Sequence, residues 1–247
     1  MSLPDSVYPP PAGVTPRKVG ASRGWRWIVE AFYLVRPQPL TWVLLALTFI
    51  VINLAMSLVP GIGQVLSFLL SPVFAGGFVL AAHKASQGGE LELSDLFEGF
   101  RRALQPLFGV ALFCIVLVAA ALLVIGLVGS ALGIGAKVAA DSASAGFGFS
   151  IVLFVLAVVL GFAIGAATWF APPLVTLSGQ GAWAAVKAGV RGGLLNWPAM
   201  LVCGVMMTVL FGLALLPLGL GLLLWFPVMY VTGYTAWRDV FGEPLPS

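Results

Sequence analysis

Charged residues able to do chemistry are concentrated in one stretch of this chain, between residues 90 and 102. That stretch contains Glu90, Glu92, Asp95, Glu98, Arg101 and Arg102. Two carboxylates held close together can perform general acid–base catalysis, because their environments can drive their pKa values apart. Acids with basic neighbours more often form the solvated face of a helix, so we predict no catalysis here.

The other reactive side chains stand alone in the sequence. His83 is the single histidine. Because a metal site needs several nitrogen, sulfur or carboxylate ligands, we interpret His83 as a residue at the membrane interface. Cys114 and Cys203 fall inside apolar runs, where a thiol behaves as a small hydrophobe. No glycine-rich loop follows a strand, as a nucleotide site would require. We therefore expect no enzyme activity, cofactor, metal or nucleic-acid partner.

Composition places the chain in a membrane. Of its 247 residues, 60% are hydrophobic and 9% are charged, whereas about a quarter of the residues in soluble domains are charged. Because every fold leaves much of its surface exposed, the surrounding solvent must be lipid. Six apolar runs reach the roughly 20 residues that a spanning helix needs. They are Leu40–Val59, Ile62–Ala82, Pro106–Leu127, Phe149–Leu177, Pro198–Leu216 and Leu218–Tyr234.

The connections and the basic residues predict how these runs are arranged. The motif "VPGIG" joins the first two runs and "LPLGLG" the last two, so each pair forms an antiparallel hairpin, while the small-residue loop Ser130–Gly148 separates the third run from the fourth. Eleven of the 12 basic residues fall on one side of the membrane, and Lys137 alone falls on the other. By the positive-inside rule, both termini face the cytoplasm.

Each hairpin is preceded by a segment that is apolar on one face only. In the charged stretch, Leu93, Leu96, Phe97, Phe100 and Leu104 recur at helical spacing. Its four charges would cost about 10 kcal/mol at the bilayer centre, so this helix should lie in the plane of the cytoplasmic interface. The segments "RGWRWIVEAFYLVRPQPL" and "GAWAAVKAGVRGGLLNWP" repeat the pattern. A polar residue and a proline end each copy, at Gln38-Pro39, Gln105-Pro106 and Asn196-Trp197-Pro198.

These patterns predict an all-α polytopic membrane protein with six transmembrane helices in three hairpin repeats, each preceded by an amphipathic interfacial helix. The repeats cover about residues 23–87, 88–177 and 178–241 of a single membrane domain, residues 23–247. They are parallel copies around an axis along the membrane normal, unlike inverted repeats of transporters. A disordered, proline-rich cytoplasmic tail, residues 1–22, precedes them.

The segments "RGWRWIVEAFYLVRPQPL", "SPVFAGG" and "LSDLFEGFRRAL" resemble an uncharacterised family of six-span inner-membrane proteins of proteobacteria. The resemblance covers nearly the whole chain after the tail. It implies an inner-membrane location and no assigned activity. The layout of hairpins and interfacial helices is distantly similar to the membrane domain attached to some glycerophosphodiester phosphodiesterases, without a catalytic domain.

Prolines inside the second helix of each hairpin are the strongest functional indication. A mid-helix proline frees the carbonyl four residues before it, and in lipid such a carbonyl needs a partner or a wet cavity. Three bent helices around one axis could enclose an apolar pocket for a lipid or another uncharged ligand. Alternatively, the bends only help the helices to pack. The candidate pocket residues are Pro72, Trp169, Pro172, Pro173, Trp225 and Pro227.

Basic residues beside the in-plane helices are candidates for contact with anionic lipid headgroups, namely Arg23, Arg26, Arg36, Arg101 and Arg102. The expected partners are membrane lipids, together with a membrane-protein partner or further copies of the chain. We expect a non-enzymatic function, that of an accessory or organising inner-membrane protein that binds lipid or a membrane partner. The alternative is a carrier or channel for an uncharged or lipid-like substrate.

Overall fold

The computed structural model describes residues 14–138, 143–216 and 218–242. Within these ranges every regular element is a helix. In chain order the elements are α1 (Arg23–Val35), α2 (Pro39–Ser57), α3 (Ile62–Ser86), the short 3-10 helix η1 (Leu93–Phe97), α4 (Glu98–Val138), α5 (Ala143–Thr176), α6 (Ala182–Leu195), α7 (Trp197–Leu215) and α8 (Leu222–Phe241).

Five helical segments of the described chain are long and apolar enough to cross a membrane. They are α2, α3, η1 with α4, α5 and α7, which correspond to the first five predicted runs. The sixth predicted run, Leu218–Tyr234, is not confirmed. Its helix, α8, begins only at Leu222, after a turn, and its last turns carry Arg238 and Asp239. These charged residues lower the hydropathy of α8 compared with the other five segments.

The second unit differs from its predicted form in two places. Its in-plane segment is η1 followed directly by α4, and the helix breaks at Ala103 (φ −148°, ψ 29°) rather than at Gln105. Pro106 then lies in the first turn after the break, where a missing N–H costs no hydrogen bond. The predicted loop Ser130–Gly148 is also helical up to Val138 and again from residue 143.

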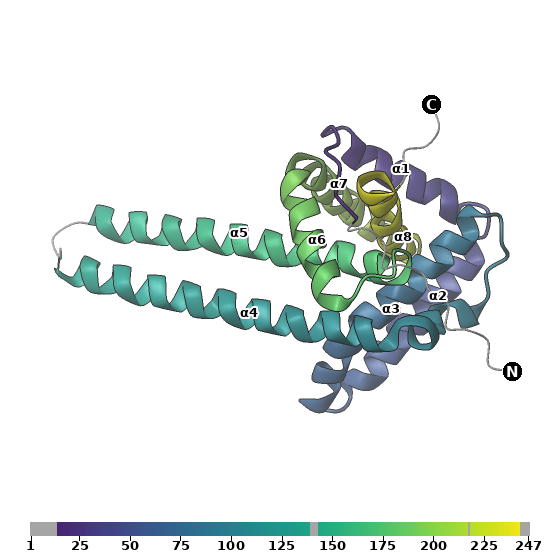
Figure 1. The fold of residues 1–247 in the computed structure, drawn as a ribbon, viewed down its shortest axis with the longest axis horizontal. Helices are drawn as coiled ribbons and strands as arrows, with labels where there is room; N and C mark the ends of the chain where they lie inside the picture. Colours follow the sequence, from purple (N-terminus) through teal and green to yellow (C-terminus); the bar gives the residue numbers. More distant parts are fainter. Residues whose placement is uncertain (1–13, 139–142, 217, 243–247) are drawn as a thin grey trace, which may run out of the picture.

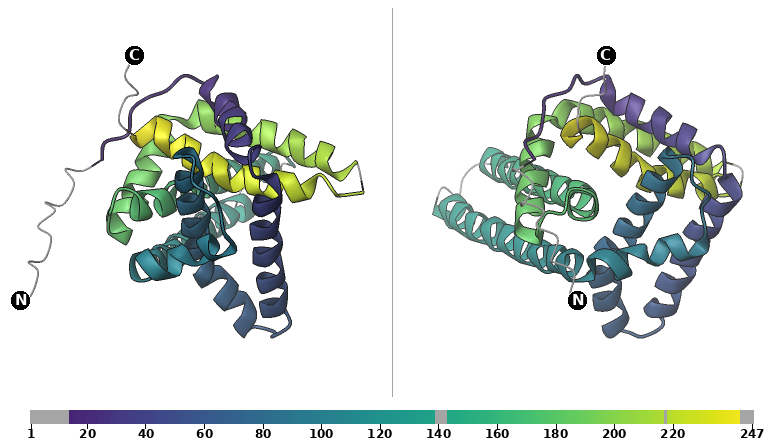
Figure 2. Two further views of the ribbon diagram at one scale, coloured as in Figure 1. Left: turned by 90° about the vertical axis from the view of Figure 1, so that its right-hand side faces the viewer. Right: turned by 45° about the vertical axis from the view of Figure 1, so that its right-hand side comes forward.

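The three hairpins diverge from a common base (Figures 1 and 2). The pair α4/α5 extends alone to the left in Figure 1, whereas α2/α3 and α7/α8 point in two other directions in the left view of Figure 2. Large apolar side chains such as Leu122 and Phe154 are exposed on these arms, while Trp42 and Phe170 are buried at the base. Exposed apolar arms are what lipid, rather than water, tolerates.

The helices returning from the hairpin tips, α3, α5 and α8, meet at the centre of the molecule. Each of the three contains proline in its interior, as predicted. Each in-plane segment packs mainly on the hairpin of another unit: η1 on α2/α3, α6 on α4/α5 and α1 on α7/α8. A threefold arrangement requires this cyclic order. The internal repeat itself stays a prediction, because the three units differ in length.

Glycines let the helix backbones approach closely where each of these segments packs on the hairpin of another unit. A Cβ on Gly24 of α1 would overlap the carbonyl oxygen of Ala199 in α7. A Cβ on Gly99, in the first turn of α4, would overlap the carbonyl oxygen of Val73 in α3, and one on Gly193 of α6 would overlap α5. The in-plane segments therefore dock through the small-residue contacts that membrane helices commonly use.

The side-chain amide of Gln38 fixes the first point where an in-plane helix turns into a hairpin. Its Nε2 donates to the carbonyl of Gly89 (3.0 Å), and its Oε1 accepts from the N–H of Leu91 (2.8 Å). It thus holds two alternate residues of the non-helical segment that precedes η1. The equivalent Gln105 is exposed.

Asn196 makes the same pair of bonds to the segment that precedes α1. Its Nδ2 donates to the carbonyl of Arg17 (3.0 Å), and its Oδ1 accepts from the N–H of Val19 (2.7 Å). The N–H of Arg17 in turn donates to the carbonyl of Val240 (2.9 Å). Within the predicted tail, residues 1–22, Arg17 and Val19 are therefore held by Asn196 and by the carbonyl of Val240. Residues 1–13 of that tail lie outside the described ranges.

Replacement of Gly24 by valine should destabilise the fold. The added side chain would overlap the α7 backbone, and overpacking costs about 1–3 kcal/mol. Thermal unfolding in detergent, followed with a thiol-reactive dye, would report it, because Cys114 and Cys203 are both buried. The control is Gly161→Val, whose side chain would meet no neighbour. Equal melting temperatures for the two variants would contradict the α1–α7 contact.

Candidate functional site

An apolar gap separates α5 from α7. Its volume is about 290 Å³, and no charged side chain lines it. The walls come from α5, α7 and α8, and Trp27 of α1 contributes one end. The lining residues are Trp27, Phe162, Gly165, Ala166, Trp169, Met200, Cys203, Gly204, Met207, Trp225 and Met229. Methionines and aromatic rings adapt to flexible apolar ligands.

Two exposed glycines, Gly165 of α5 and Gly204 of α7, lie along this gap. A Cβ built on either one would meet no atom within 4 Å, so neither glycine serves close helix packing here. Their exposure shows that the gap is open at the side of the hairpins, where the spanning helices meet lipid. The gap is therefore accessible from the side of the helices.

Trp27 forms the boundary between the gap and a polar network. Its ring lines the gap, while its Nε1–H donates to the Asp239 carboxylate (2.8 Å). An apolar ring with a polar edge is typical of the membrane interface. This end of the gap thus lies beside charged groups, and its remainder is apolar.

A second apolar groove of about 480 Å³ lies between α1 and the α7/α8 hairpin. Its walls include Trp25, Ile28, Val29 and Phe32, which form the predicted apolar face of the first in-plane helix. Trp225 lines both this groove and the gap and so separates them. The Trp225 side chain is fixed by its Nε1–H, which donates to the carbonyl oxygen of Met207 (3.0 Å).

The predicted pocket residues do not gather in one site. A small cavity of about 120 Å³ lies among the three central helices α3, α5 and α8, and only Trp169 and Pro172 of the candidates line it. Trp169 and Trp225 line the gap. None of these cavities is lined by Pro72, Pro173 or Pro227.

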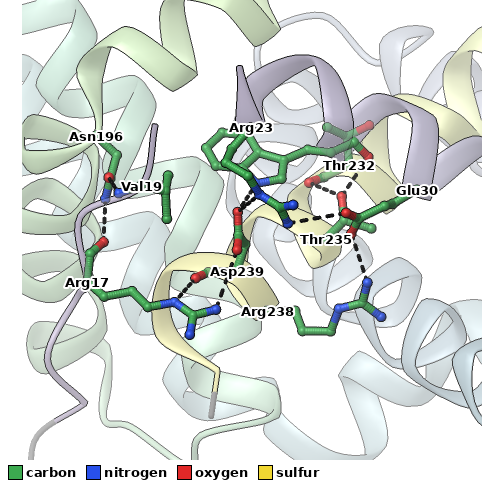
Figure 3. A network of polar contacts seen from close by, with 10 residues as sticks. Arg17, Val19, Arg23, Glu30, Asn196, Thr232, Thr235, Arg238 and Asp239 are labelled. Carbon is green, nitrogen blue, oxygen red and sulfur yellow. Dashed lines mark hydrogen bonds and ion pairs between the residues drawn. The ribbon is translucent and has the colours of Figure 1, made fainter. Parts of the chain in front are cut away.

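Arg23, a candidate for lipid contact, lies in an internal ion-pair network (Figure 3). Its Nε donates to the Asp239 carboxylate (2.6 Å), and its Nη2 donates to the Glu30 carboxylate (3.2 Å). The hydrogen bond to Asp239 raises the pKa of Arg23 above its ordinary value. Arg17 also pairs with Asp239, and Arg238 pairs with Glu30 (2.9 Å). Arg23 is held between both carboxylates of this network, so it is poorly placed for anionic lipid.

The other four candidate arginines are exposed. Arg101 and Arg102 both pair with Glu98, at 3.3 and 2.6 Å, but their side chains remain 73% and 68% exposed. Arg26 and Arg36 are exposed on and just after α1 and take no part in the ion pairs of the described residues. These four side chains can reach headgroups.

One other predicted residue is placed differently from expectation. Asp95 of the acidic stretch is buried, 7% exposed, rather than solvated, because both its oxygens accept from Lys84 Nζ (3.1 Å each). His83 lies beside Tyr234, with 3.4 Å between Nδ1 and the hydroxyl oxygen. Among the described residues no three potential metal ligands cluster.

Sequence reasoning missed the α7 wall of the gap. A detectable signal exists, since Met200, Cys203, Gly204 and Met207 recur at helical spacing on one face of α7. Such a stripe is usually core packing, and only the separation of α5 from α7 shows that here it faces a gap.

Comparison with known proteins agrees with the membrane architecture. No protein-family model matches the chain, and no solved structure matches it. It is similar to a protein of Burkholderia thailandensis named as a probable inner membrane protein, with 29% identity over 93% of this chain and 95% of the relative. The chain is a multi-pass inner-membrane protein. The comparisons do not support the distant resemblance to the phosphodiesterase membrane domain.

Replacement of Asp239 by asparagine should destabilise the protein by about 2–3 kcal/mol, because charged hydrogen bonds are lost and Arg23 is left without its main partner. The control is Glu98→Gln, whose arginine partners are mostly exposed and which should cost about 1 kcal/mol or less. Melting temperatures in detergent would measure both. A smaller loss for Asp239→Asn than for the control would contradict the network.

Proposed function

We propose that this protein is a non-enzymatic, lipid-binding accessory protein of the inner membrane, which holds a lipid acyl chain in the gap between α5 and α7. The observation that carries the proposal is a side-opening gap of about 290 Å³ lined without a charged side chain. Intramembrane transport and catalysis usually depend on ionisable residues within the bilayer, whereas an acyl chain needs only apolar walls.

The position of Trp27 supports a lipid as the ligand. A lipid needs an apolar site for its chain and a polar boundary at headgroup depth, and Trp27 joins the gap to the Asp239 network. The methionines that line the gap suit a flexible chain better than a rigid ligand.

A carrier for an uncharged or lipid-like substrate is the second candidate. The small cavity among the three proline-containing helices favours it, since bent helices are places where a bundle can open. A carrier would move lipid or solute across reconstituted vesicles, and Pro227→Ala would change that rate. An accessory protein would retain lipid without moving it.

Replacement of Gly204 by phenylalanine should fill the gap and lower the amount of phospholipid retained by the purified protein by about tenfold. The new ring would take the space of the chain, and a loss of about 1.4 kcal/mol of apolar contact gives that factor. Native mass spectrometry of gently purified protein would count the bound lipids.

The matched control is Gly212→Phe. This glycine is also an exposed residue of α7 whose added side chain would meet no neighbour, but it lines none of the cavities. The control should retain lipid like the natural chain. Equal retention by both variants would refute the proposed site, and lipid movement across vesicles by the natural chain would favour the carrier.

We also infer that both termini face the cytoplasm. The distribution of the basic residues supports this orientation. A membrane-impermeant maleimide should label Lys137→Cys in intact spheroplasts and Gln87→Cys only after permeabilisation, while the buried natural cysteines stay unlabelled. Labelling of both introduced cysteines from the same side would contradict the topology.

A further inference from the structure

A groove of about 460 Å³ lies between α6 and the segment that precedes α1. It is separate from the gap, because the two share no lining residue. Its walls are Val14, Thr15, Pro16, Gln180, Ala184, Lys187, Ala188 and Arg191. Among these residues, the only charged side chains are two cations one helical turn apart on α6.

Lys187 and Arg191 differ in their pairing from the arginines nearby. Arg17 and Arg23 form ion pairs with Asp239 and Glu30, whereas neither α6 cation takes part in an ion pair within the described ranges. Both side chains are exposed. The groove therefore carries two positive charges without an acidic residue in its walls.

The position of α6 places this groove at headgroup depth. Gly193 and Gly189 of α6 pack on α5 around Ala166, so α6 lies across the base of the α4/α5 arm, as Figure 1 shows. The exposed ring of Trp183 lies 5.6 Å from Lys187 Nζ in a cation–π contact. Exposed tryptophan next to lysine is typical of the membrane–water interface.

The groove also contains an unsatisfied polar atom. The Gln180 side-chain oxygen is buried and has no hydrogen-bond partner among the described residues. Buried acceptors normally find a donor. Because this oxygen is closed off from solvent, the charges of Lys187 and Arg191 dominate the groove, and they attract a phosphate and repel an ammonium group.

We propose that this groove binds the headgroup of an anionic phospholipid of the phosphatidylglycerol type. Lys187 and Arg191 bind the phosphate diester, Arg191 through its planar guanidinium, which matches phosphate oxygens. This site is independent of the gap, which recognises only an apolar chain.

The test is lipid titration of the full-length protein in detergent, read by native mass spectrometry. Phosphatidylglycerol should bind at least about tenfold more tightly than phosphatidylcholine or phosphatidylethanolamine, and Lys187→Gln with Arg191→Gln should abolish that preference, since each basic residue contributes about 1 kcal/mol near an anionic headgroup. The matched control, Arg101→Gln with Arg102→Gln, removes two exposed charges elsewhere and should keep the preference.

Equal headgroup preference in the natural chain and the Lys187/Arg191 double variant would overturn the proposal. Displacement of the phospholipid by glycerol 3-phosphate at equal concentration would also overturn it, by showing a site for soluble phosphate esters. The Gly204→Phe variant separates this site from the gap: it should lose lipids of every headgroup class in the gap but retain phosphatidylglycerol on α6.

Discussion

The carboxylate of Asp239 joins the beginning of the chain to its end. It accepts hydrogen bonds from Arg23 and Trp27, which lie more than two hundred residues earlier in the sequence. Together with Asn196, which holds the segment before α1, it fastens the first in-plane helix onto the last hairpin. Without this joint the cyclic order of the three units would be open. The position of Trp27, and hence the end of the gap, depends on it.

The contacts of Asp239 and Asn196 hold the base of the molecule together but do not bring the three hairpins into contact along their length. In lipid no hydrophobic force draws α5 toward α7, because lipid tails are as apolar as the helix surfaces. Helices associate there only where small residues let the backbones approach or where polar groups bond. At Gly24, Gly99 and Gly193 that approach occurs. Between Gly165 and Gly204 it does not, and the space between those helices remains open to a lipid chain.

Charge is distributed over this base in two ways. Between α1 and α8, Arg23 and Arg238 are paired with Asp239 and Glu30, and their contribution is structural. On α6, Lys187 and Arg191 have no acidic partner among the described residues, so they are available to bind a ligand. Composition alone does not distinguish paired from unpaired basic residues. Only cations without an acidic partner are free to attract anionic headgroups. Both proposed sites follow from groups that the fold leaves without a partner.

The spanning helices and the prolines inside the return helices could be predicted from the sequence, because transfer of a residue into lipid and the missing proline N–H are local properties. The break at Ala103 and the helical continuation to Val138 could not, since neighbouring helices override local turn signals. By itself, the sequence determined that the protein is a helical membrane protein. Only the tertiary structure decided that Arg23 is held in ion pairs while Lys187 and Arg191 have no acidic partner among the described residues, and that a stripe on α7 faces a gap, because each depends on contacts between residues far apart in the chain.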